Sequence, residues 1–274
     1  MAEGRFDRMA ALYGVKATYA LSRCRVAVLG LGGVGSYAVE ALARSGVGAL
    51  DLFDGDTVAV TNINRQLYAL TSTIGLYKTD VAVRRVTDIN PACRVTGHNI
   101  FYTPANAEAV DWRRFDYVVD CVDDVEAKIE TACQCRQLGV PVISCMGAAN
   151  KTNPMGFIVE DISRTKTDPL ARTVRRRLRE RGVTRLKVVY SEEKPRKPRD
   201  GALPPHTPAS NAFVPAAAGL LAAATVITDL IDRYTTAQKA RATTPTGEND
   251  GGDRTDREEP TTVSRHENGT DIKC

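Results

Sequence analysis

A short apolar run that ends directly on a glycine-rich turn is the feature that most constrains this chain. Residues 25–35 read RVAVLGLGGVG, and the continuous aliphatic run before the glycines is typical of a buried parallel strand. Apolar residues at helical spacing then predict a helix from about residue 33 to residue 45. Glycines let the backbone approach an anion closely, and the free amides at the start of the helix would face it. The pattern predicts a phosphate loop at Gly30, Gly32, Gly33 and Gly35.

A second predicted strand, residues 49–53, is followed by Asp54 and Asp56. An acid about twenty residues after the glycine turn holds a ribose hydroxyl in nucleotide-binding folds. The glycines alone also fit a turn that only packs a helix on a strand, but strand, loop, helix and acid together favour a nucleotide site. NAD and ATP both remain open at this point, because their folds share this opening.

Composition limits the alternatives without choosing a function. The chain has 274 residues, 43% of them hydrophobic, which suits one nucleotide-binding domain with a smaller appended region. A formal net charge of +4 is too small to imply a nucleic-acid partner by itself. The seven cysteines include no CxxC pair, so we expect reduced thiols and a cytoplasmic protein without a four-cysteine zinc site. The first residues lack the apolar segment of a signal peptide.

Strands and helices alternate over residues 25–145. Further strands are predicted at 93–96, 115–120 and 140–144, with helices from residue 78 to about 89 and up to about 138 between them. This alternation predicts an α/β, Rossmann-like, doubly wound and mostly parallel sheet. Carboxylates that follow its strands, such as Asp123 and Asp124, would point into the ligand crevice. Lys78 lies in the first turn of a helix, where the dipole favours an acid, so we expect it to meet a specific anion.

A basic segment follows the predicted sheet. Gly156 to Val159 is a candidate strand, and Asp168 and Pro169 predict the start of a helix that ends before Gly182. Its apolar stripe leaves the rest of the surface to arginines, which fit either a solvated face or a phosphate-binding surface. The candidates for phosphate contact are Arg172, Arg175, Arg176 and Arg179, in a basic run that continues to Arg199.

The last apolar segment lies within residues 211–231. It is short and rich in alanine for a membrane span, so we expect a buried helix that packs on the sheet or on a second copy, and no membrane. From about residue 236 the chain is polar and is predicted to be disordered to residue 274. The predicted organisation is one domain over 1–235, made of a core (25–147), a basic part (148–210) and the apolar helix (211–235).

Five motifs in order, GLGGVGS, DLFDGDTV, TNINRQ, GLYK and DCVDD, carry a resemblance to a known superfamily. Over about residues 5–147 the chain resembles the ubiquitin-activating-enzyme-like adenylyltransferases of the ThiF/MoeB/HesA superfamily. Within it, the segments ISCMGAANKTNP, TDPLARTVRRRLRERG, VVYSEE and NAFVPAAAGLL are similar to those of the tRNA threonylcarbamoyladenosine dehydratases. The resemblance then covers all but the tail.

The resemblance implies ATP and Mg²⁺ as cofactors, tRNA as partner and a homodimer. It places Asp123 on the metal and Asp54, with Asp56 beside it, at the ribose. Arg8 matches an arginine that reaches ATP across the dimer in relatives, a role for which Arg5 also qualifies. Position 124 is Asp where the sulfur-carrier activators of the superfamily usually have Asn. The implied contacts with the nucleotide and its phosphates come from the glycine loop and from Asn62, Asn64, Arg65 and Lys78.

Three functions remain as hypotheses. The first is a dehydratase that transfers AMP to the carboxylate of threonylcarbamoyladenosine in tRNA and closes the side chain to an oxazolone; a sulfur-transfer protein is a further candidate partner. The second is an activator of a ubiquitin-like sulfur carrier, disfavoured because such relatives carry paired CxxC zinc ligands. The third, an NAD-dependent oxidoreductase or a nucleotide-sensing module, is disfavoured by TNINRQ and Lys78.

Overall fold

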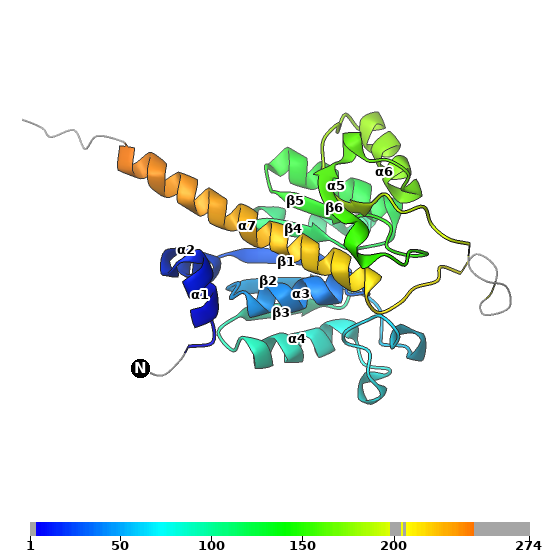
Figure 1. Ribbon diagram of the computed structural model, residues 1–274, viewed down its shortest axis with the longest axis horizontal. Helices are drawn as coiled ribbons and strands as arrows, with labels where there is room; N and C mark the ends of the chain where they lie inside the picture. The colour runs from blue at the N-terminus through cyan, green and yellow to red at the C-terminus, as the bar shows by residue number, and fades with distance from the viewer. Residues whose placement is uncertain (1–3, 198–203, 205–206, 244–274) are drawn as a thin grey trace, which may run out of the picture.

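The computed structural model of the chain describes residues 4–197, 204 and 207–243, and its centre is one seven-stranded sheet (Figure 1). The strand order is β3-β2-β1-β4-β5-β7-β6. All neighbouring pairs are parallel except β6 with β7. The strands are β1 (Arg25–Leu29), β2 (Ala49–Phe53), β3 (Arg94–His98), β4 (Tyr117–Asp120), β5 (Val142–Cys145), β6 (Phe157–Asp161) and β7 (Lys187–Ser191).

The described part of the chain forms seven α-helices, and helices lie on both faces of the sheet (Figure 1). Alternation along β1 divides the core: Val26 and Val28 pack with α3, α4 and α7, whereas Ala27 and Leu29 pack with α5 and residues 102–115. The predicted doubly wound α/β fold is therefore confirmed. The helices are α1 (Asp7–Tyr13), α2 (Val15–Leu21), α3 (Gly35–Arg44), α4 (Lys78–Ile89), α5 (Val125–Leu138), α6 (Pro169–Glu180) and α7 (Val214–Thr243).

The order in which strands are added to the sheet reverses between β1 and β4, two parallel neighbours at its centre. β2 and β3 lie to one side of β1, and β4, β5, β7 and β6 lie to the other. In open α/β sheets such a switch point leaves a crevice at the carboxyl ends of the strands. The glycine loop after β1 and the carboxylates after β4 therefore meet at one edge of the sheet, which we call the carboxyl edge.

The basic segment 148–210 is more integrated than its description as an appended part implies. The candidate strand at 156–159 forms as β6, and residues 187–191, for which no strand was predicted, form β7 between β5 and β6. β7 pairs with a strand far away in the sequence, for example Val189 with Cys145 of β5, so the local sequence does not reveal it. The predicted start of α6 is confirmed, because the Asp168 carboxylate accepts a hydrogen bond from the Ala171 amide.

The long C-terminal helix α7 packs along α3 across the front of the sheet (Figure 1). Its segment Val214–Ala240 is long and apolar enough to cross a membrane, but half of the most apolar window is buried inside this protein, as in a core helix. Packing on the sheet layer was predicted. The helix nevertheless continues past the predicted boundary at residue 235 to Thr243, because Ala, Gln, Lys and Arg there are good helix formers. The rest of the predicted tail, 244–274, lies outside the described residues.

We predict that Gly219→Ala destabilises the protein although it raises helix propensity. A Cβ at Gly219 would lie 2.1 Å from the carbonyl oxygen of Val34 in the loop before α3, so the two helices must separate. Overpacking of this kind costs about 1–3 kcal/mol, which outweighs the gain of about 1 kcal/mol from replacing a helical glycine. Urea unfolding measures the loss. Leu220→Ala, at a 48% exposed neighbour, is the control and should change the unfolding free energy by less than about 1 kcal/mol.

Candidate nucleotide site

The turn after β1 requires glycine for two steric reasons. Gly30 has φ +84°, and a Cβ there would lie 2.9 Å from the backbone oxygen of Cys121. At Gly35 a Cβ would lie 1.8 Å from the backbone oxygen of Gly30. Side chains at these positions would therefore push the loop away from β4 and open the turn that leads into α3. The loop stays close to the sheet, with the first amides of α3 at the crevice.

The other two glycines line the crevice from inside. A Cβ at Gly33 would meet Pro215 at the start of α7, at 3.1 Å, and the Cγ of Arg65 at 3.4 Å. At Gly32 the space is open, with only the Gln66 side chain at 3.9 Å. Three distant parts of the chain thus meet at the carboxyl edge: the glycine loop, segment 61–66 and the start of α7.

Asp54 holds the glycine loop in place. Its buried carboxylate accepts hydrogen bonds from the amide of Leu31, at 2.7 Å, and from the amide of Asp56, at 2.8 Å. Both oxygens thus bind backbone amides, one of which belongs to the loop itself. The predicted contact with a ribose would use the remaining lone pairs of a carboxylate whose position is already fixed.

Lys78 is 4% exposed and lies between the two acids that follow β2. Its Nζ is 2.6 Å from Asp56 Oδ2 and 3.7 Å from Asp54 Oδ1. Without a ligand, two carboxylates of the same chain therefore act as the anion that was predicted for this lysine. Asp56 is half exposed, so a bound phosphate can exchange with it as the partner of the ammonium group.

The polar segment 61–66 forms part of the crevice wall. The Arg65 guanidinium donates to the backbone oxygen of Thr61 and to Asn64, and Asn64 donates to the backbone oxygen of Ser210 just before α7. Asn62 accepts from the amide of Ala59 and so closes a turn of its own segment. Arg65 and Asn64 are held at the crevice, whereas the Asn62 oxygen is used locally.

Gln66 is a site residue that our motif analysis did not single out, although it ends the TNINRQ motif. Its side chain is 8% exposed, and its Oε1 has no hydrogen-bond partner among the described residues. A buried amide oxygen left unpaired costs about 1–3 kcal/mol, so such an atom beside the open Gly32 is suited to a ligand that donates a hydrogen bond. The hydroxyl and amino groups of a nucleotide are donors of this kind.

The turn after β4 presents Asp123 to solvent. Its side chain is exposed and makes no hydrogen bond or ion pair with a described residue, unlike Asp124, which caps α5 through the Ala127 amide. Asn, the usual residue at this position in the sulfur-carrier activators, would cap the helix equally well. The Asp at position 124 is therefore explained by capping and need not be a second metal ligand. Below the turn, Asp120 binds the fully buried Lys128 at 3.1 Å and accepts from the amide of Val122. The Asp123 carboxylate is therefore displayed on a fixed turn.

Cys121, at this edge, lies against Cys145. The Cys121 thiol donates to Cys145 Sγ at 3.9 Å, and this hydrogen bond together with burial raises the pKa of the Cys121 thiol well above its ordinary value. A partly buried thiol that stays protonated is suited to packing rather than to attack on a substrate. All six described cysteines are free, as expected for reduced thiols. Within residues 4–197, 204 and 207–243, no three His, Cys, Asp or Glu side chains gather as a metal cluster.

The basic helix α6 differs from the prediction at Arg175. We expected Arg175, Arg176 and Arg179 to face solvent together, but Arg175 is half-buried and donates to both oxygens of Thr165. The reason is the turn before α6, whose carbonyl oxygens need donors. Arg172, Arg176 and Arg179 are the exposed arginines of the predicted set. Arg199 lies outside the described residues.

Two further arginines join α6 to α5. Arg177 pairs with Glu126 at 2.7 Å, and Arg181 pairs with Glu130 at 3.2 Å, so the helices run in the same direction. Glu126 lies in the first turn of α5, whereas Arg177 is two turns into α6. The first two turns of α6, which carry Arg172 and Arg176, therefore extend beyond the start of α5 toward the carboxyl edge.

Arg8 lies far from the glycine loop of its own chain. Its helix α1 sits at the amino ends of the strands (Figure 1), where Phe6 packs at 3.4 Å from the Cβ position of Gly46 at the end of α3. Arg8 itself is exposed, and Arg5 donates to the backbone oxygen of Ile89. Within one chain neither arginine reaches the crevice, so a role at the nucleotide requires a second copy.

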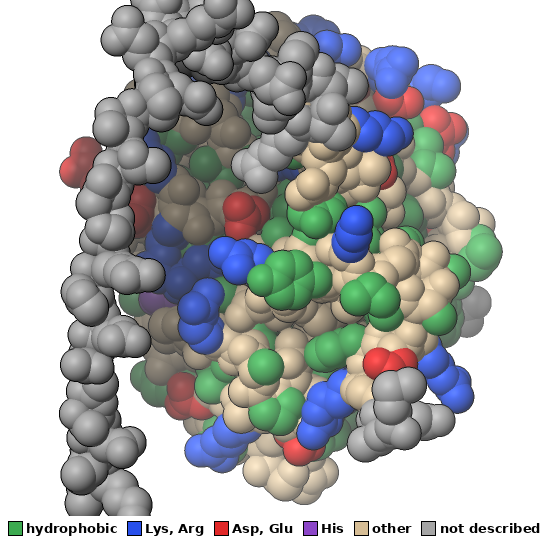
Figure 2. Space-filling model, turned by 90° about the vertical axis from the view of Figure 1, so that its left-hand side faces the viewer, with side chains coloured by type: hydrophobic (Ala, Val, Ile, Leu, Met, Phe, Trp, Pro, Cys, Tyr) green, Lys and Arg blue, Asp and Glu red, His purple; other side chains and the backbone are tan. Residues whose placement is uncertain are grey.

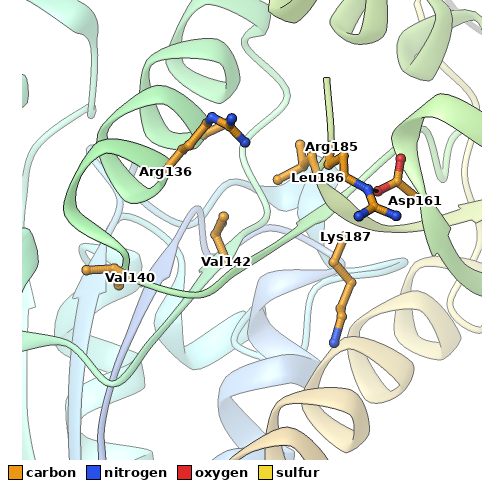
Figure 3. Close-up of a pocket in the computed structure, with 8 residues that line it drawn as sticks. Arg136, Val140, Val142, Asp161, Arg185, Leu186 and Lys187 are labelled. Carbon is orange, nitrogen blue, oxygen red and sulfur yellow. Dashed lines mark ion pairs between the residues drawn. The ribbon is translucent and has the colours of Figure 1, made fainter. Parts of the chain in front are cut away.

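A cavity of about 360 Å³ at the amino ends of the strands is not the nucleotide site (Figure 3). Arg136 points across it toward Arg185, whose partner is Asp161 at 3.6 Å. Lys187 points away toward α7, where it pairs with Asp229 at 2.5 Å. Two of the three cations are thus already paired, and no glycine of the loop lines this cavity.

A doubly wound sheet with a glycine loop, a buried acid and two cations at its switch point defines a nucleotide-binding α/β protein. A family model, the ThiF family, matches residues 6–261. A tRNA threonylcarbamoyladenosine dehydratase from Bacillus subtilis (strain 168) is 43% identical over 243 residues, which cover 83% of this chain and 94% of that protein. The chain therefore belongs to the ThiF family and groups with the tRNA threonylcarbamoyladenosine dehydratases, so the family predicted from the motifs is confirmed.

Solved structures agree with this assignment. Crystal structures of the Escherichia coli tRNA N6-threonylcarbamoyladenosine dehydratase TcdA with AMP and with ATP match this fold with TM-scores of 0.79 and 0.77. Both are 34% identical and cover 85% of this chain and 96% of theirs. The adenylyltransferase and sulfurtransferase uba4 of Pyricularia oryzae is 34% identical, but only over 48% of this chain. Similarity to that protein is restricted to about half of the chain.

Two substitutions at the site should differ in their effect on the free energy of unfolding. Lys78→Ala leaves the buried Asp54 without its cation and should lower the unfolding free energy by about 3 kcal/mol. Asp123→Ala removes an exposed carboxylate that contacts no described side chain and should change it by less than about 0.5 kcal/mol. Denaturant unfolding of the ligand-free protein tests both. Equal stability of the two variants would mean that the Lys78 ion pairs contribute nothing to the fold.

Proposed function

We propose that this protein is an ATP-dependent dehydratase that closes the threonylcarbamoyl side chain of an adenosine in tRNA to an oxazolone. The main support for this proposal is the crevice at the switch point, where Arg65 and Lys78 lie beside the glycine loop. Two phosphate-directed cations beside the loop favour a triphosphate over NAD. The high coverage of the B. subtilis relative supports the same substrate class, and the cytoplasm, where tRNA is found, is the proposed location.

The chemical problem in this reaction is the leaving group. A carboxylate oxygen leaves poorly, so transfer of AMP to the carboxylate of the substrate, with release of pyrophosphate, makes an activated acyl group. The carbamoyl oxygen of the same side chain then attacks the carbonyl carbon, and AMP leaves with the original carboxylate oxygen. Water is lost overall, and no protein nucleophile is needed, in agreement with the raised pKa of the Cys121 thiol.

Charge balance at the crevice indicates what else the reaction needs. The four carboxylates Asp54, Asp56, Asp123 and Asp124 outnumber Arg65 and Lys78, so this chain alone does not neutralise a triphosphate. Asp123 fits Mg²⁺, which prefers one or two carboxylates together with phosphate oxygens and water. Bound there, Mg²⁺ would supply charge stabilisation on the phosphates. Lys78 would exchange Asp56 for phosphate, and Arg65 would bind and orient the phosphate chain.

A homodimer would supply a further cation. Figure 2 shows the side of the molecule that carries α1 and α2, where hydrophobic side chains gather among lysines and arginines. Leu12, Val15 and Tyr19 are 73%, 74% and 59% exposed on these short helices. Docking of this apolar patch against the carboxyl edge of a second copy would cover it, and would bring Arg8 of the partner subunit toward the crevice that Arg8 cannot reach within its own chain.

The exposed arginines of α6 form the proposed tRNA surface. Arg172 and Arg176 lie on the turns that extend toward the carboxyl edge, and Arg179 follows one turn later. A phosphate backbone on these side chains would run past the Asp123 turn, which places a protruding nucleotide at the crevice. Activation of a sulfur carrier remains the second candidate, but the chain has no CxxC pair to hold the zinc that such relatives carry.

Asp123→Ala should abolish turnover. The variant should still bind ATP, but more weakly than the wild-type protein does. The experiment incubates the full-length protein with ATP, Mg²⁺ and tRNA that carries threonylcarbamoyladenosine, and follows pyrophosphate release and the oxazolone by mass spectrometry. Loss of one metal-holding carboxylate is expected to lower kcat by at least about 100-fold. Release of pyrophosphate with a ubiquitin-like carrier and not with tRNA would favour the second candidate.

Replacing Arg172, Arg176 and Arg179 together with alanine should weaken tRNA binding and leave ATP affinity unchanged. Each lost phosphate contact should flatten the log–log salt dependence by about one unit, since the slope is roughly −0.9 per phosphate on duplexes. Filter binding at several salt concentrations measures the tRNA affinity and its salt dependence. Arg177→Ala with Arg181→Ala is the matched control, because these arginines pair with α5. An unchanged salt slope in the triple variant would place the RNA elsewhere.

A further inference from the structure

One buried ion pair joins the loop after β5 to the start of α6. The Lys151 Nζ lies 2.7 Å from Asp168 Oδ2, and both side chains are 1% exposed. The ammonium group also donates to the backbone oxygen of Gly147 at 2.7 Å and to that of Ser191 at 3.2 Å. Its three protons are therefore all used, and three separate segments meet at one cation.

Asp168 uses its two oxygens for different elements. Oδ1 accepts from the Ala171 amide and caps α6, at 2.9 Å, while Oδ2 accepts from Lys151. A Cβ at Gly147 would lie 3.2 Å from Oδ2, so the loop after β5 passes close to the cap. One carboxylate thus binds both the first turn of α6 and the Lys151 ammonium group.

The backbone beside both partners is held in an unfavourable conformation. Asn150, with φ 60°, and Thr167, with φ 55°, are the two non-glycine residues of the described chain with positive φ. They directly precede Lys151 and Asp168. Such conformations persist only where the surroundings fix them, and they concentrate at functional sites. Asn150 exchanges hydrogen bonds with Ala209 through its amide and its side-chain oxygen.

The backbone of Lys151 leads to the glycine loop. Its carbonyl oxygen accepts from the Asn211 side chain, and the Asn211 oxygen accepts from the Val214 amide at the start of α7. The next residue, Pro215, is the one that packs against Gly33. Lys151 therefore contacts α6 through its ammonium group and the wall of the nucleotide crevice through its main chain.

We propose that Lys151 is a positioning residue that sets α6, and with it Arg172 and Arg176, in register with the nucleotide crevice. The proposal rests on the tRNA dehydratase function and adds how the RNA-binding helix is aligned with the reacting phosphate. A buried ion pair is a poor source of stability compared with apolar side chains of similar volume, whereas its three directed hydrogen bonds define a geometry. Lys151 contacts neither reactant and acts through α6.

The test is the double variant Lys151→Met with Asp168→Asn, measured in the full-length protein. Methionine keeps most of the volume, and asparagine still caps the helix, so no buried charge is left unpaired. ATP affinity by calorimetry should stay within about twofold, while kcat on tRNA should fall about 10- to 100-fold, as expected for a misplaced substrate. Hydrogen exchange of the first turn of α6 should accelerate. Lys187→Met with Asp229→Asn, a Lys–Asp pair at the other edge, should change none of these.

A folded double variant with wild-type kcat, KM and exchange would overturn the proposal, because the pair would then only fill space. If that variant does not fold, Lys151→Arg carries the test, since it keeps the charge but changes the geometry of the three hydrogen bonds; unchanged kinetics and exchange would again refute positioning. If the wild-type protein does not consume ATP on tRNA, the proposed function fails instead. The exchange measurement needs neither ATP nor tRNA and still decides whether Lys151 holds α6.

Discussion

The hydrogen bond from the Leu31 amide to Asp54 is the contact on which the site depends. It ties the glycine loop after β1 to the acid after β2, and the same acid lies 3.7 Å from the Lys78 ammonium group. Loop, acid and cation thus hold one another before any ligand arrives. Preorganised charge of this kind costs little reorganisation when a phosphate binds, which is the main electrostatic advantage of an enzyme site.

Helix α7 gives the crevice its second wall and limits what else the fold can do. Pro215 packs against Gly33, and Gly219 allows α7 to approach the backbone at Val34. The same helix buries Val226 and Leu230 in the core on the front of the sheet. An apolar segment that by composition alone resembles a membrane span therefore has a defined structural role, and the ligand site and the hydrophobic core share one element.

Three lysines at the carboxyl edge are all buried, yet their partners differ. Lys78 faces a half-exposed acid and can exchange it for a ligand, whereas Lys128 and Lys151 each bind a fully buried carboxylate and backbone oxygens. A lysine can exchange its carboxylate for a ligand only if the released carboxylate is hydrated by water. Asp56 is exposed enough for this, whereas Asp120 and Asp168 are not. The exposure of the partner thus separates the lysine proposed to bind phosphate from the two that pair with buried carboxylates.

The sequence by itself determined the elements whose signals are local. The strand before the glycines, the acid after β2, the Asp168 cap and the family motifs are each defined by residues only a few positions apart, and the doubly wound sheet follows from the alternation of strands and helices. Tertiary structure decided the rest, because it depends on neighbours far away in the chain. Arg175 is withdrawn from the surface by Thr165, residues 187–191 become a strand because β5 and β6 offer edges, and Gln66 matters because Gly32 lies beside it. Hydrogen bonds and close contacts between distant segments have no periodicity, so no pattern in the sequence reports them.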